Sequence, residues 1–384
     1  MIIIDNNNRL GIQQTTTMKP KKILHYPIPG NATGGILHIY GEPTPQQDVI
    51  LYCGGFPDGL EPISNLAERL ATTRNGNDRG CYIGVTCFPG FDCETFNEQK
   101  FNGFKRGGFT FDEVTCCLRD AADALFMEHA KATADESKTT FTLMTHDWGA
   151  AIGHMFINRA IDEPKFTQHK PNRAVMLDVL MSPHPKSNHK EALRGIEVYT
   201  PTARDHLFTL AYRTAFAISF AASLHISETI GLIVMGIMVT VGFKIFRLSP
   251  LMDVDSEHMK KTRTDPELFL YMTYPYYHMF REFFKGSTNA FVDATLPLDL
   301  KQMPILYIYG AQKNVMFHDY RSVAMLEREE KQGLSECRVV KLEGIGHWMY
   351  LQEPEICETE IRKFLRGSEK KKESRSNITN QSNL

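Results

Sequence analysis

The residues of this chain that could do chemistry begin with Asp147, in the segment Thr145–Gly149, which reads Thr-His-Asp-Trp-Gly. An apolar, β-branched run at 140–144 precedes it, and a helical pattern rich in small residues, Ala150–Ala160, follows it. This order predicts a strand, a sharp turn and a helix, with the aspartate held out beside the helix N-terminus. A carboxylate attacks esters poorly, but it can displace a leaving group from saturated carbon and form an alkyl ester. The pattern therefore indicates epoxides or alkyl halides as substrates, although Asp147 could instead only cap the helix.

A histidine near the end of the chain supplies a group that could complete such a reaction. His347 follows a predicted strand, Val339–Leu342, and precedes the last predicted helix, Pro354–Leu365. A neutral imidazole there could take a proton from the water that hydrolyses the ester on Asp147, so we expect activity to fall at low pH. The alternative is an ordinary surface histidine whose hydrogen bonds are satisfied.

The acid that would orient this histidine is Asp178. It lies in an otherwise apolar strand pattern, Ala174–Leu180, where an ionised carboxylate is costly unless it has a partner. A hydrogen bond to His347 would supply that partner and would fix the ring. Two alternatives stay open. Asp178 could bond only to backbone amides, or Asp319, on the predicted helix after the strand Ile305–Tyr309, could be the acid.

Strand and helix patterns alternate along the chain around these residues. Helices are predicted between most of the strands, for example at Phe111–Lys131. This alternation is typical of the α/β class, with a mostly parallel sheet covered by helices on both faces. The predicted strands are Ile36–Tyr40, Val49–Cys53, Tyr82–Phe88, Thr139–Met144, Ala174–Leu180, Ile305–Tyr309 and Val339–Leu342.

The alternation stops between about Pro183 and Pro297, where the chain reads as nearly all helix. This stretch is far longer than an ordinary connection, so we expect an inserted helical cap domain over the carboxyl edge of the sheet. The predicted parts are a polar N-terminal segment at 1–20, a first core part at 21–182, the cap at 183–300, a second core part at 301–366, and a disordered charged tail at 367–384.

Three motifs in this order resemble the epoxide hydrolase and haloalkane dehalogenase branch of the α/β-hydrolase family, over about Lys22–Leu365. The segment Gly54–Asp58 reads Gly-Gly-Phe-Pro-Asp and is similar to the family's His-Gly-x-Pro loop, with glycine in place of the histidine. The second motif is the turn around Asp147, and the third is the Gly-His-Trp motif of His347. The resemblance implies an α/β-hydrolase fold with an inserted cap and the Asp-ester chemistry described above.

The same resemblance implies roles for particular atoms. In the family the Phe56–Pro57 bond is cis, and the backbone N–H groups of Phe56 and Trp148 form the oxyanion hole. Some members of the dehalogenase branch place their acid at the strand position that Asp178 matches. Thr145 departs from the family's usual glycine.

The choice between epoxides and halides depends on the cap. In epoxide hydrolases two cap tyrosines hydrogen-bond the epoxide oxygen, and the segment around Tyr277 resembles the stretch that bears one of them. Tyr212 is the candidate for the second, and Trp348 is a further candidate for contact with substrate; each tyrosine could instead pack between cap helices. A departing halide needs N–H or indole donors, but both tryptophans, Trp148 and Trp348, lie outside the cap. Epoxide hydrolysis therefore leads; the alternatives are a haloalkane dehalogenase-type hydrolase and a non-catalytic hydrolase-fold scaffold.

Composition narrows the class of protein. The chain has 384 residues, 42% of them hydrophobic, and a formal net charge of −2, which gives no indication of nucleic-acid binding. Its eight cysteines show no metal-ligand spacing, so we expect free thiols in a reducing compartment, with no metal and no cofactor. We expect no secretory signal, because the apolar run Met1–Ile4 is too short, and hence a cytoplasmic location.

The cap contains an unusually apolar stretch. Thr214–Leu224 is apolar, and Thr229–Phe243 runs for fifteen residues without a charge before Lys244 and Arg247. A membrane-spanning helix needs about 20 apolar residues, so this stretch is short for a span. Two interpretations stay open: two cap helices packed on each other above a small apolar substrate, or an interfacial patch at 214–246 that docks on a membrane and admits lipid epoxides.

Overall fold

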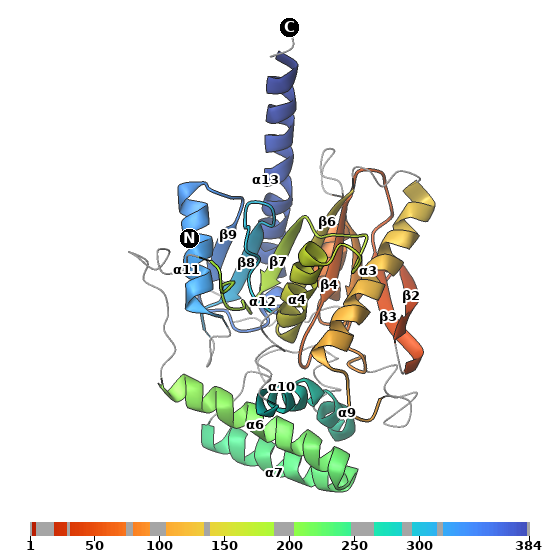
Figure 1. Cartoon of the computed structure of the whole chain (residues 1–384), viewed down its shortest axis with the longest axis vertical. Helices are drawn as coiled ribbons and strands as arrows, with labels where there is room; N and C mark the ends of the chain where they lie inside the picture. Colours follow the sequence, from red (N-terminus) through yellow and green to blue (C-terminus); the bar gives the residue numbers. More distant parts are fainter. Residues whose placement is uncertain are drawn as a thin grey trace.

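The computed structural model describes residues 2–4, 19–28, 31–73, 80–92, 105–133, 139–187, 203–246, 265–285, 294–312 and 318–381. Within these residues the chain forms a nine-stranded sheet with the strand order β1-β9-β8-β7-β6-β4-β5-β3-β2. Helices cover both faces of the sheet, and a separate group of helices lies beyond one end of its strands (Figure 1).

The sheet is parallel except at one edge. The pairs from β5 through β4, β6, β7, β8 and β9 to β1 are parallel, whereas β3 pairs antiparallel with both β5 and β2. The predicted mostly parallel α/β sheet is therefore confirmed. The strands are β1 Ile2–Ile4, β2 Lys22–Ile28, β3 Asn31–Tyr40, β4 Asp48–Cys53, β5 Tyr82–Thr86, β6 Thr140–His146, β7 Arg173–Leu177, β8 Ile305–Gly310 and β9 Arg338–Leu342.

The strand predictions differ from the structure at several places; for example, β3 begins at Asn31 and not at Ile36, and β5 ends at Thr86 and not at Phe88. Strands β1 and β2 were not predicted, because β1 has three residues and β2 is an edge strand whose sequence, Lys-Ile-Leu-His-Tyr-Pro-Ile, mixes polar and apolar residues. Strand β7 ends at Leu177, not at Leu180. Asp178 has a φ of 64°, a left-handed conformation that cannot continue a strand.

Side chains alternate between the two faces of the sheet and form two hydrophobic layers. In β4, for example, Leu51 joins the layer beneath α3, α4 and α11, while Ile50 joins the layer beneath α1, α12 and α13. The core helices are α1 Ser64–Ala71, α3 Phe111–Thr133, α4 Trp148–Asp162, α11 Tyr320–Gln332, α12 Met349–Gln352 and α13 Pro354–Gln381.

The start of α3 shows how local sequence fixes these elements. The Thr110 hydroxyl accepts from the Glu113 N–H at 3.2 Å, and the Glu113 carboxylate accepts from the Thr110 N–H at 2.9 Å. This reciprocal pair is a capping box, which satisfies two N–H groups at the start of the helix. The predicted start at Phe111 is confirmed.

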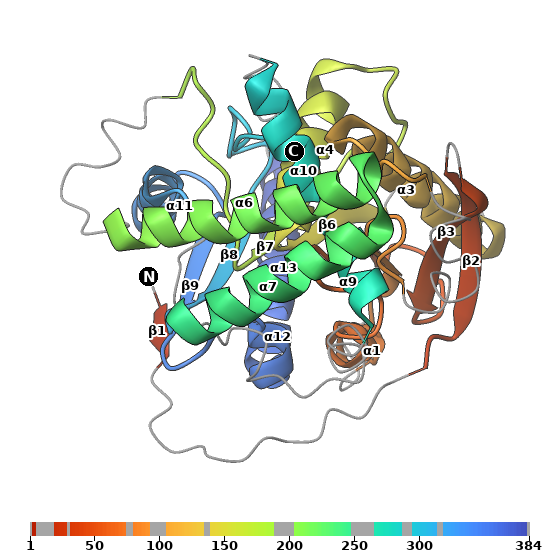
Figure 2. The same cartoon turned by 90° about the horizontal axis from the view of Figure 1, so that it is seen from below.

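Four helices lie between β7 and β8 in the described part of the predicted cap: α6 Ala203–His225, α7 Glu228–Phe246, α9 Pro266–Tyr271 and α10 Tyr274–Phe284. Helices α6 and α7 lie side by side, as Figures 1 and 2 both show. Helices α9 and α10 lie between this pair and the core, and α10 packs on α6. Residues 188–202, 247–264 and 286–293 of the predicted cap, with Arg247, lie outside the described residues.

The end of the chain differs from the prediction. A disordered tail was predicted from Gly367, but α13 continues to Gln381 and extends away from the core (Figure 1). The glutamate, lysine and arginine residues of 369–375 are good helix formers, and no proline interrupts them, so a helix that starts at Pro354 can continue.

Candidate active site

The turn at Asp147 joins β6 to α4 and has φ 52° and ψ −127°, an uncommon conformation for a residue with a side chain. Two glycines make room for it. A Cβ on Gly149 would lie 2.2 Å from the Cys53 carbonyl oxygen, and one on Gly153 would lie 2.6 Å from Thr145 Cγ2. Thr145 therefore fits beneath the turn because the facing helix position has no side chain. Asp147 occupies the N-cap position of α4, but its side chain makes no capping hydrogen bond.

The loop after β4 delivers a backbone donor to this aspartate. The Phe56 N–H donates to Asp147 Oδ1 at 2.8 Å, and the Phe56–Pro57 bond is cis, as the resemblance implied. A Cβ on Gly55 would lie 2.6 Å from Asp147 Oδ1 and 2.3 Å from the Trp148 nitrogen. The loop can therefore approach the turn this closely only with glycine at position 55. Trp148 begins α4, where the first N–H groups have no acceptor within the helix.

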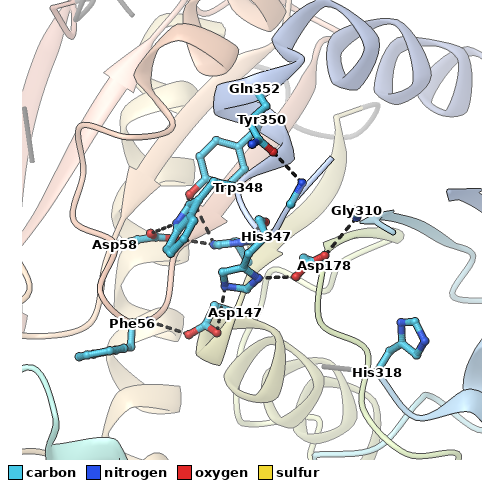
Figure 3. Close-up of polar contacts among 12 residues, drawn as sticks. Phe56, Asp58, Asp147, Asp178, Gly310, His318, His347, Trp348, Tyr350 and Gln352 are labelled. Atoms are coloured by element: carbon cyan, nitrogen blue, oxygen red, sulfur yellow. Dashed lines mark hydrogen bonds and ion pairs between the residues drawn. The ribbon is translucent and has the colours of Figure 1, made fainter. Parts of the chain in front are cut away.

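His347 lies between two carboxylates, one on each ring nitrogen (Figure 3). Its Nε2 is 3.3 Å from Asp147 Oδ2, and its Nδ1 donates to Asp178 Oδ2. The other oxygen of Asp178 accepts from the Gly310 N–H at 3.2 Å, and Asp178 is fully buried. The structure thus brings together the predicted nucleophile, base and acid, which follow β6, β9 and β7 and face the cap.

The charge of His347 follows from these contacts. Burial lowers its pKa, but the charge of Asp178 and the hydrogen bonds with Asp147 and Asp178 outweigh burial and raise the pKa to about 9. In the resting site His347 is therefore an imidazolium at neutral pH. The neutral His347 expected of a base therefore requires the charge on one of the two carboxylates to change first.

The alternative acid lies elsewhere. Asp319 occupies the N-cap position of α11, accepts from the Arg321 N–H at 2.9 Å and pairs with the Arg321 guanidinium at 2.5 Å. Its carboxylate is therefore engaged in capping and in an ion pair, and of the two candidate acids it is Asp178 that reaches His347.

A second buried Asp–His pair lies directly behind His347, and the sequence analysis missed it. His146 Nδ1 is 2.5 Å from Asp58 Oδ2, and His146 Nε2 is 3.1 Å from the His347 carbonyl oxygen. Asp58 also accepts from the Trp348 indole at 2.8 Å and from the Tyr350 hydroxyl at 2.9 Å (Figure 3). Only the positions of these residues in the sequence could have indicated the pair: Asp58 ends the loop motif, and His146 immediately precedes Asp147.

The protonation of this pair can be read from its partners. Burial raises the pKa of Asp58, but the charge and hydrogen bond of His146 and the bond from Trp348 outweigh it, so the pKa is lowered and Asp58 is ionised. The His347 carbonyl can only accept, so both ring nitrogens of His146 donate. Asp58 and the His347 carbonyl thus hold the two ring nitrogens of His146.

This network also corrects one prediction. Trp348 was a candidate for contact with substrate, but it is almost fully buried and its indole donates to Asp58. A buried tryptophan needs a partner for its N–H, and Asp58 is that partner. Trp348 is thus part of the support behind His347.

The cap contributes tyrosines, although not both of those predicted. Tyr276 on α10 lies over Trp148 at 5.2 Å and over Phe56 at 5.3 Å between ring centroids, and Tyr212 on α6 lies 6.0 Å from Tyr276. Tyr277 was assigned wrongly, because its hydroxyl contacts His225 Nε2 at 3.2 Å on another face of α10. Neighbouring helix residues point about 100° apart, so only one of this Tyr-Tyr pair can face Asp147.

The remaining lining is aromatic. The Phe56 ring is 5.3 Å from both Phe216 on α6 and Phe269 on α9, and Phe111 stacks on Trp148 at 5.6 Å. These contacts join the cap to the core around the turn at Asp147. In the described residues, aromatic side chains thus surround the turn that carries the Asp147 carboxylate.

Comparisons with known proteins show which solved structures share this fold. No protein-family model matches the sequence, and no curated protein matches it. A haloalkane dehalogenase loop variant from Bradyrhizobium elkanii matches with a TM-score of 0.57 at 14% identity, over 92% of this chain and 99% of that one. An epoxide hydrolase of the α/β-hydrolase superfamily, from metagenomes of hot environments, matches with a TM-score of 0.52 at 14% identity, over 91% and 99%. A putative epoxide hydrolase from Klebsiella pneumoniae matches with a TM-score of 0.50 at 12% identity, over 91% and 97%.

Proposed function

Because the chain has the α/β-hydrolase fold, which solved epoxide hydrolases and haloalkane dehalogenases share, we propose that it is a hydrolase that opens epoxides through an ester on Asp147. The observation that carries the proposal is the set of contacts on one carboxylate. Asp147 accepts from the Phe56 N–H at 2.8 Å and lies 3.3 Å from His347 Nε2, whose other nitrogen donates to Asp178. A carboxylate in this arrangement is a nucleophile for saturated carbon, and a histidine beside it can activate water.

In the first step an Asp147 oxygen attacks an epoxide carbon and the carbon–oxygen bond of the ring breaks. The oxygen that leaves carries the electron pair and needs a proton, which a cap tyrosine can give. Tyr276 contacts the rings of Trp148 and Phe56, and Tyr212 contacts the ring of Tyr276. Burial raises the pKa of both tyrosines, and the charge of Asp147 adds to this rise, so these two are the candidates. His347 takes no part in this step except through its charge.

In the second step the ester is hydrolysed, and the change at Asp147 itself makes His347 a base. Esterification removes the Asp147 charge and its hydrogen bond, two of the causes that raise the His347 pKa. The pKa therefore falls when the ester forms, and the ring can lose its proton and then take one from water. The attack creates an oxyanion at Asp147, beside the N–H groups of Phe56 and Trp148. Such donors typically contribute about 3–4 kcal/mol each to catalysis.

The donors at the site favour an epoxide over a halide. A departing halide would need the Trp148 indole N–H as a donor, but that N–H is hydrogen-bonded to Tyr276. Burial raises the pKa of Tyr276, and this hydrogen bond opposes the rise. Hydroxyl groups suit an epoxide oxygen, which must be protonated as it leaves carbon. A haloalkane dehalogenase remains the second candidate function, because Asp147 would serve both reactions alike.

The decisive experiment traps the intermediate. With His347→Gln, alkylation of Asp147 should proceed while hydrolysis stops, and intact-mass spectrometry after adding an epoxide should show a stable adduct. Peptide mapping should locate it on Asp147, and Asp147→Asn is the matched control that should give none. A panel of epoxides, alkyl halides and esters identifies the substrate class. Normal turnover by His347→Gln would reject the mechanism, and no reaction with any substrate would favour the non-catalytic scaffold.

We also propose that the protein acts in the cytoplasm on a small apolar substrate, such as a lipid epoxide, and that α7 docks on a membrane surface. Ile233 and Ile237 are 52% and 56% exposed, and Ile230 is 38% exposed, so α7 presents a row of apolar side chains outward. No helix in the described ranges is long and apolar enough to cross a membrane. The side chains of 238–246, including Val241 and Lys244, lie outside the described residues.

A further inference from the structure

The backbone at Asp178 has a rare conformation. The Val179 N–H donates to the Leu177 carbonyl at 2.8 Å, so Asp178 is the central residue of a γ-turn. Its φ of 64° gives the turn the form that is rare and strained. A residue keeps such a conformation only where the surrounding groups hold it. Because Asp178 accepts from His347 Nδ1, the groups that hold this turn also determine where the carboxylate beside His347 lies.

The neighbouring strand β8 binds Asp178 at its N–H, its carboxylate and its carbonyl oxygen. The Asp178 N–H donates to the Ile308 carbonyl at 2.8 Å, and the Gly310 N–H donates to Asp178 Oδ1 at 3.2 Å. The contact to the carbonyl comes from a side chain, since the Tyr307 hydroxyl donates to the Asp178 carbonyl oxygen at 3.1 Å. The main-chain contacts of β8 do not depend on side-chain type, whereas this last contact requires the hydroxyl at position 307.

A histidine fixes the direction of this hydroxyl. His318 Nδ1 is 2.8 Å from the Tyr307 oxygen, and the two rings meet edge to face with their centroids 5.8 Å apart. Tyr307 has one hydroxyl hydrogen, and a carbonyl can only accept, so the bond to Asp178 uses that hydrogen. His318 Nδ1 must then carry a hydrogen and donate it to Tyr307. The result is a chain of hydrogen bonds that runs from His318 through Tyr307 to the Asp178 carbonyl.

The members of this chain are held in the core. Tyr307 is fully buried, and its ring stacks on that of Tyr309 at 5.1 Å. His318 is buried as well, and its backbone forms a parallel bridge with Leu180. Burial, with the charge of Asp178, raises the pKa of Tyr307 well above its usual range, so the hydroxyl keeps its hydrogen. Tyr307 is therefore a permanent donor to the turn.

We propose that Tyr307 is a positioning residue for the base of the proposed hydrolysis. With His318 behind it, its hydroxyl holds the Asp178 turn, and the turn directs the carboxylate to His347 Nδ1. The inference rests on the proposed function and separates its two steps. Alkylation needs the Asp147 carboxylate, whereas hydrolysis of the ester needs a correctly oriented His347. Loss of the Tyr307 hydroxyl should therefore slow the second step and spare the first.

The first test follows the alkyl-enzyme by acid quench and intact mass, with an epoxide that the parent turns over. Tyr307→Phe removes only the hydroxyl. It should form the adduct at the parent rate and hydrolyse it about 10- to 100-fold more slowly, because a displacement of about 1 Å can cost about 100-fold in rate. The alkyl-enzyme should therefore accumulate. Tyr309→Phe, on the same strand, is the matched control and should behave as the parent does.

Variants at His318 test the chain of hydrogen bonds. His318→Leu should also slow hydrolysis of the ester, and His318→Asn, whose amide can donate near the position of Nδ1, should recover part of the rate. Added to Tyr307→Phe, His318→Leu should have little further effect, because its route through Tyr307 is already lost. The single variants at His318 test the inference by themselves if Tyr307→Phe fails to fold.

A second measurement needs no substrate. Burial lowers the pKa of His347, but the contacts of Asp178 and Asp147 raise it to about 9. If the Asp178 carboxylate turns away from the ring, the pKa falls. NMR titration of His347 should therefore give a lower pKa in Tyr307→Phe than in the parent, and no change in Tyr309→Phe. A hydroxyl that only filled space would not shift this pKa.

Three results would overturn the inference. Equal slowing of alkylation and of ester hydrolysis in Tyr307→Phe would indicate a general loss of structure. Hydrolysis at the parent rate, or an unchanged His347 pKa, would remove the role of the hydroxyl. Full additivity of Tyr307→Phe and His318→Leu would mean that His318 acts elsewhere. Absence of any adduct in His347→Gln would instead reject the proposed function, and the NMR titration would still show whether Tyr307 orients Asp178.

Discussion

The two buried Asp–His pairs of this molecule have similar parts but different surroundings. In each, a histidine donates Nδ1–H to a fully buried carboxylate: His347 to Asp178, and His146 to Asp58. The difference lies at Nε2. That of His347 faces the Asp147 carboxylate, whose charge can change in a reaction, whereas that of His146 faces a backbone carbonyl, whose charge cannot. The comparison teaches that the group beside Nε2, more than the Asp–His contact itself, decides whether such a pair is suited to catalysis or to structural support.

The largest expected effect separates the two aspartates proposed for the acid role. Asp178→Asn should lower turnover about 10⁴-fold, since an amide holds the imidazole in the wrong tautomer. Asp319→Asn should leave turnover near that of the parent, because Asp319 caps α11 and pairs with Arg321. Steady-state kinetics on one epoxide compare them. Equal losses in the two variants would remove Asp178 from the acid role.

The second prediction concerns the supporting pair and should appear first as lost stability. Asp58→Asn removes a buried carboxylate that is bonded to His146, Trp348 and Tyr350, and breaking such a buried charged pair typically costs about 3–5 kcal/mol of the free energy of unfolding. Urea denaturation measures this cost. The double variant Asp58→Asn/His146→Gln should recover part of it, because the two positions share one hydrogen-bond network. A variant that keeps full stability but no longer alkylates would show that this pair, too, takes part in the chemistry.

The third prediction uses pH to distinguish the pairs. The folded-state pKa of His347 is raised from its ordinary value of 6.5 to about 9. Its contribution to stability is therefore fully present below about pH 6.5 and is lost as the pH rises through about 9. The free energy of unfolding, measured from pH 6 to pH 10, should fall over this window, and His347→Gln should lose this component of the fall. An identical pH profile for parent and variant would contradict the assignment.

The smallest effect is expected far from both pairs and tests the membrane proposal. Ile233→Ser with Ile237→Ser should reduce co-sedimentation with anionic lipid vesicles and leave hydrolysis of a soluble epoxide unchanged. Because both side chains are more than half exposed, the melting temperature should change little. Met235→Ser, at a buried position on the same helix, is the destabilising control. A stability loss in a protein that never bound vesicles would refute docking.

Much of this site could be predicted because its signals are local. The alternation of strands and helices, the turn at Asp147 and the buried charge of Asp178 are all visible in short windows of sequence. The Asp58–His146 pair was missed because its partners lie 88 residues apart and neither breaks a hydrophobic pattern. Tyr277 was predicted in place of Tyr276. The packing of α10 against the core, not the sequence of α10, determines which face of the helix points toward Asp147.

The hydrogen bond from His146 to the His347 carbonyl has a mechanical consequence. His146 is the residue before Asp147, so the proposed nucleophile and the proposed base are linked through one peptide unit and one hydrogen bond. This short linkage belongs to the core and passes through no cap residue. On the proposed mechanism, a movement of helices α6, α7, α9 and α10 that admits substrate would leave the spacing between Asp147 and His347 unchanged. A near-attack geometry held in this way is worth several powers of ten in rate.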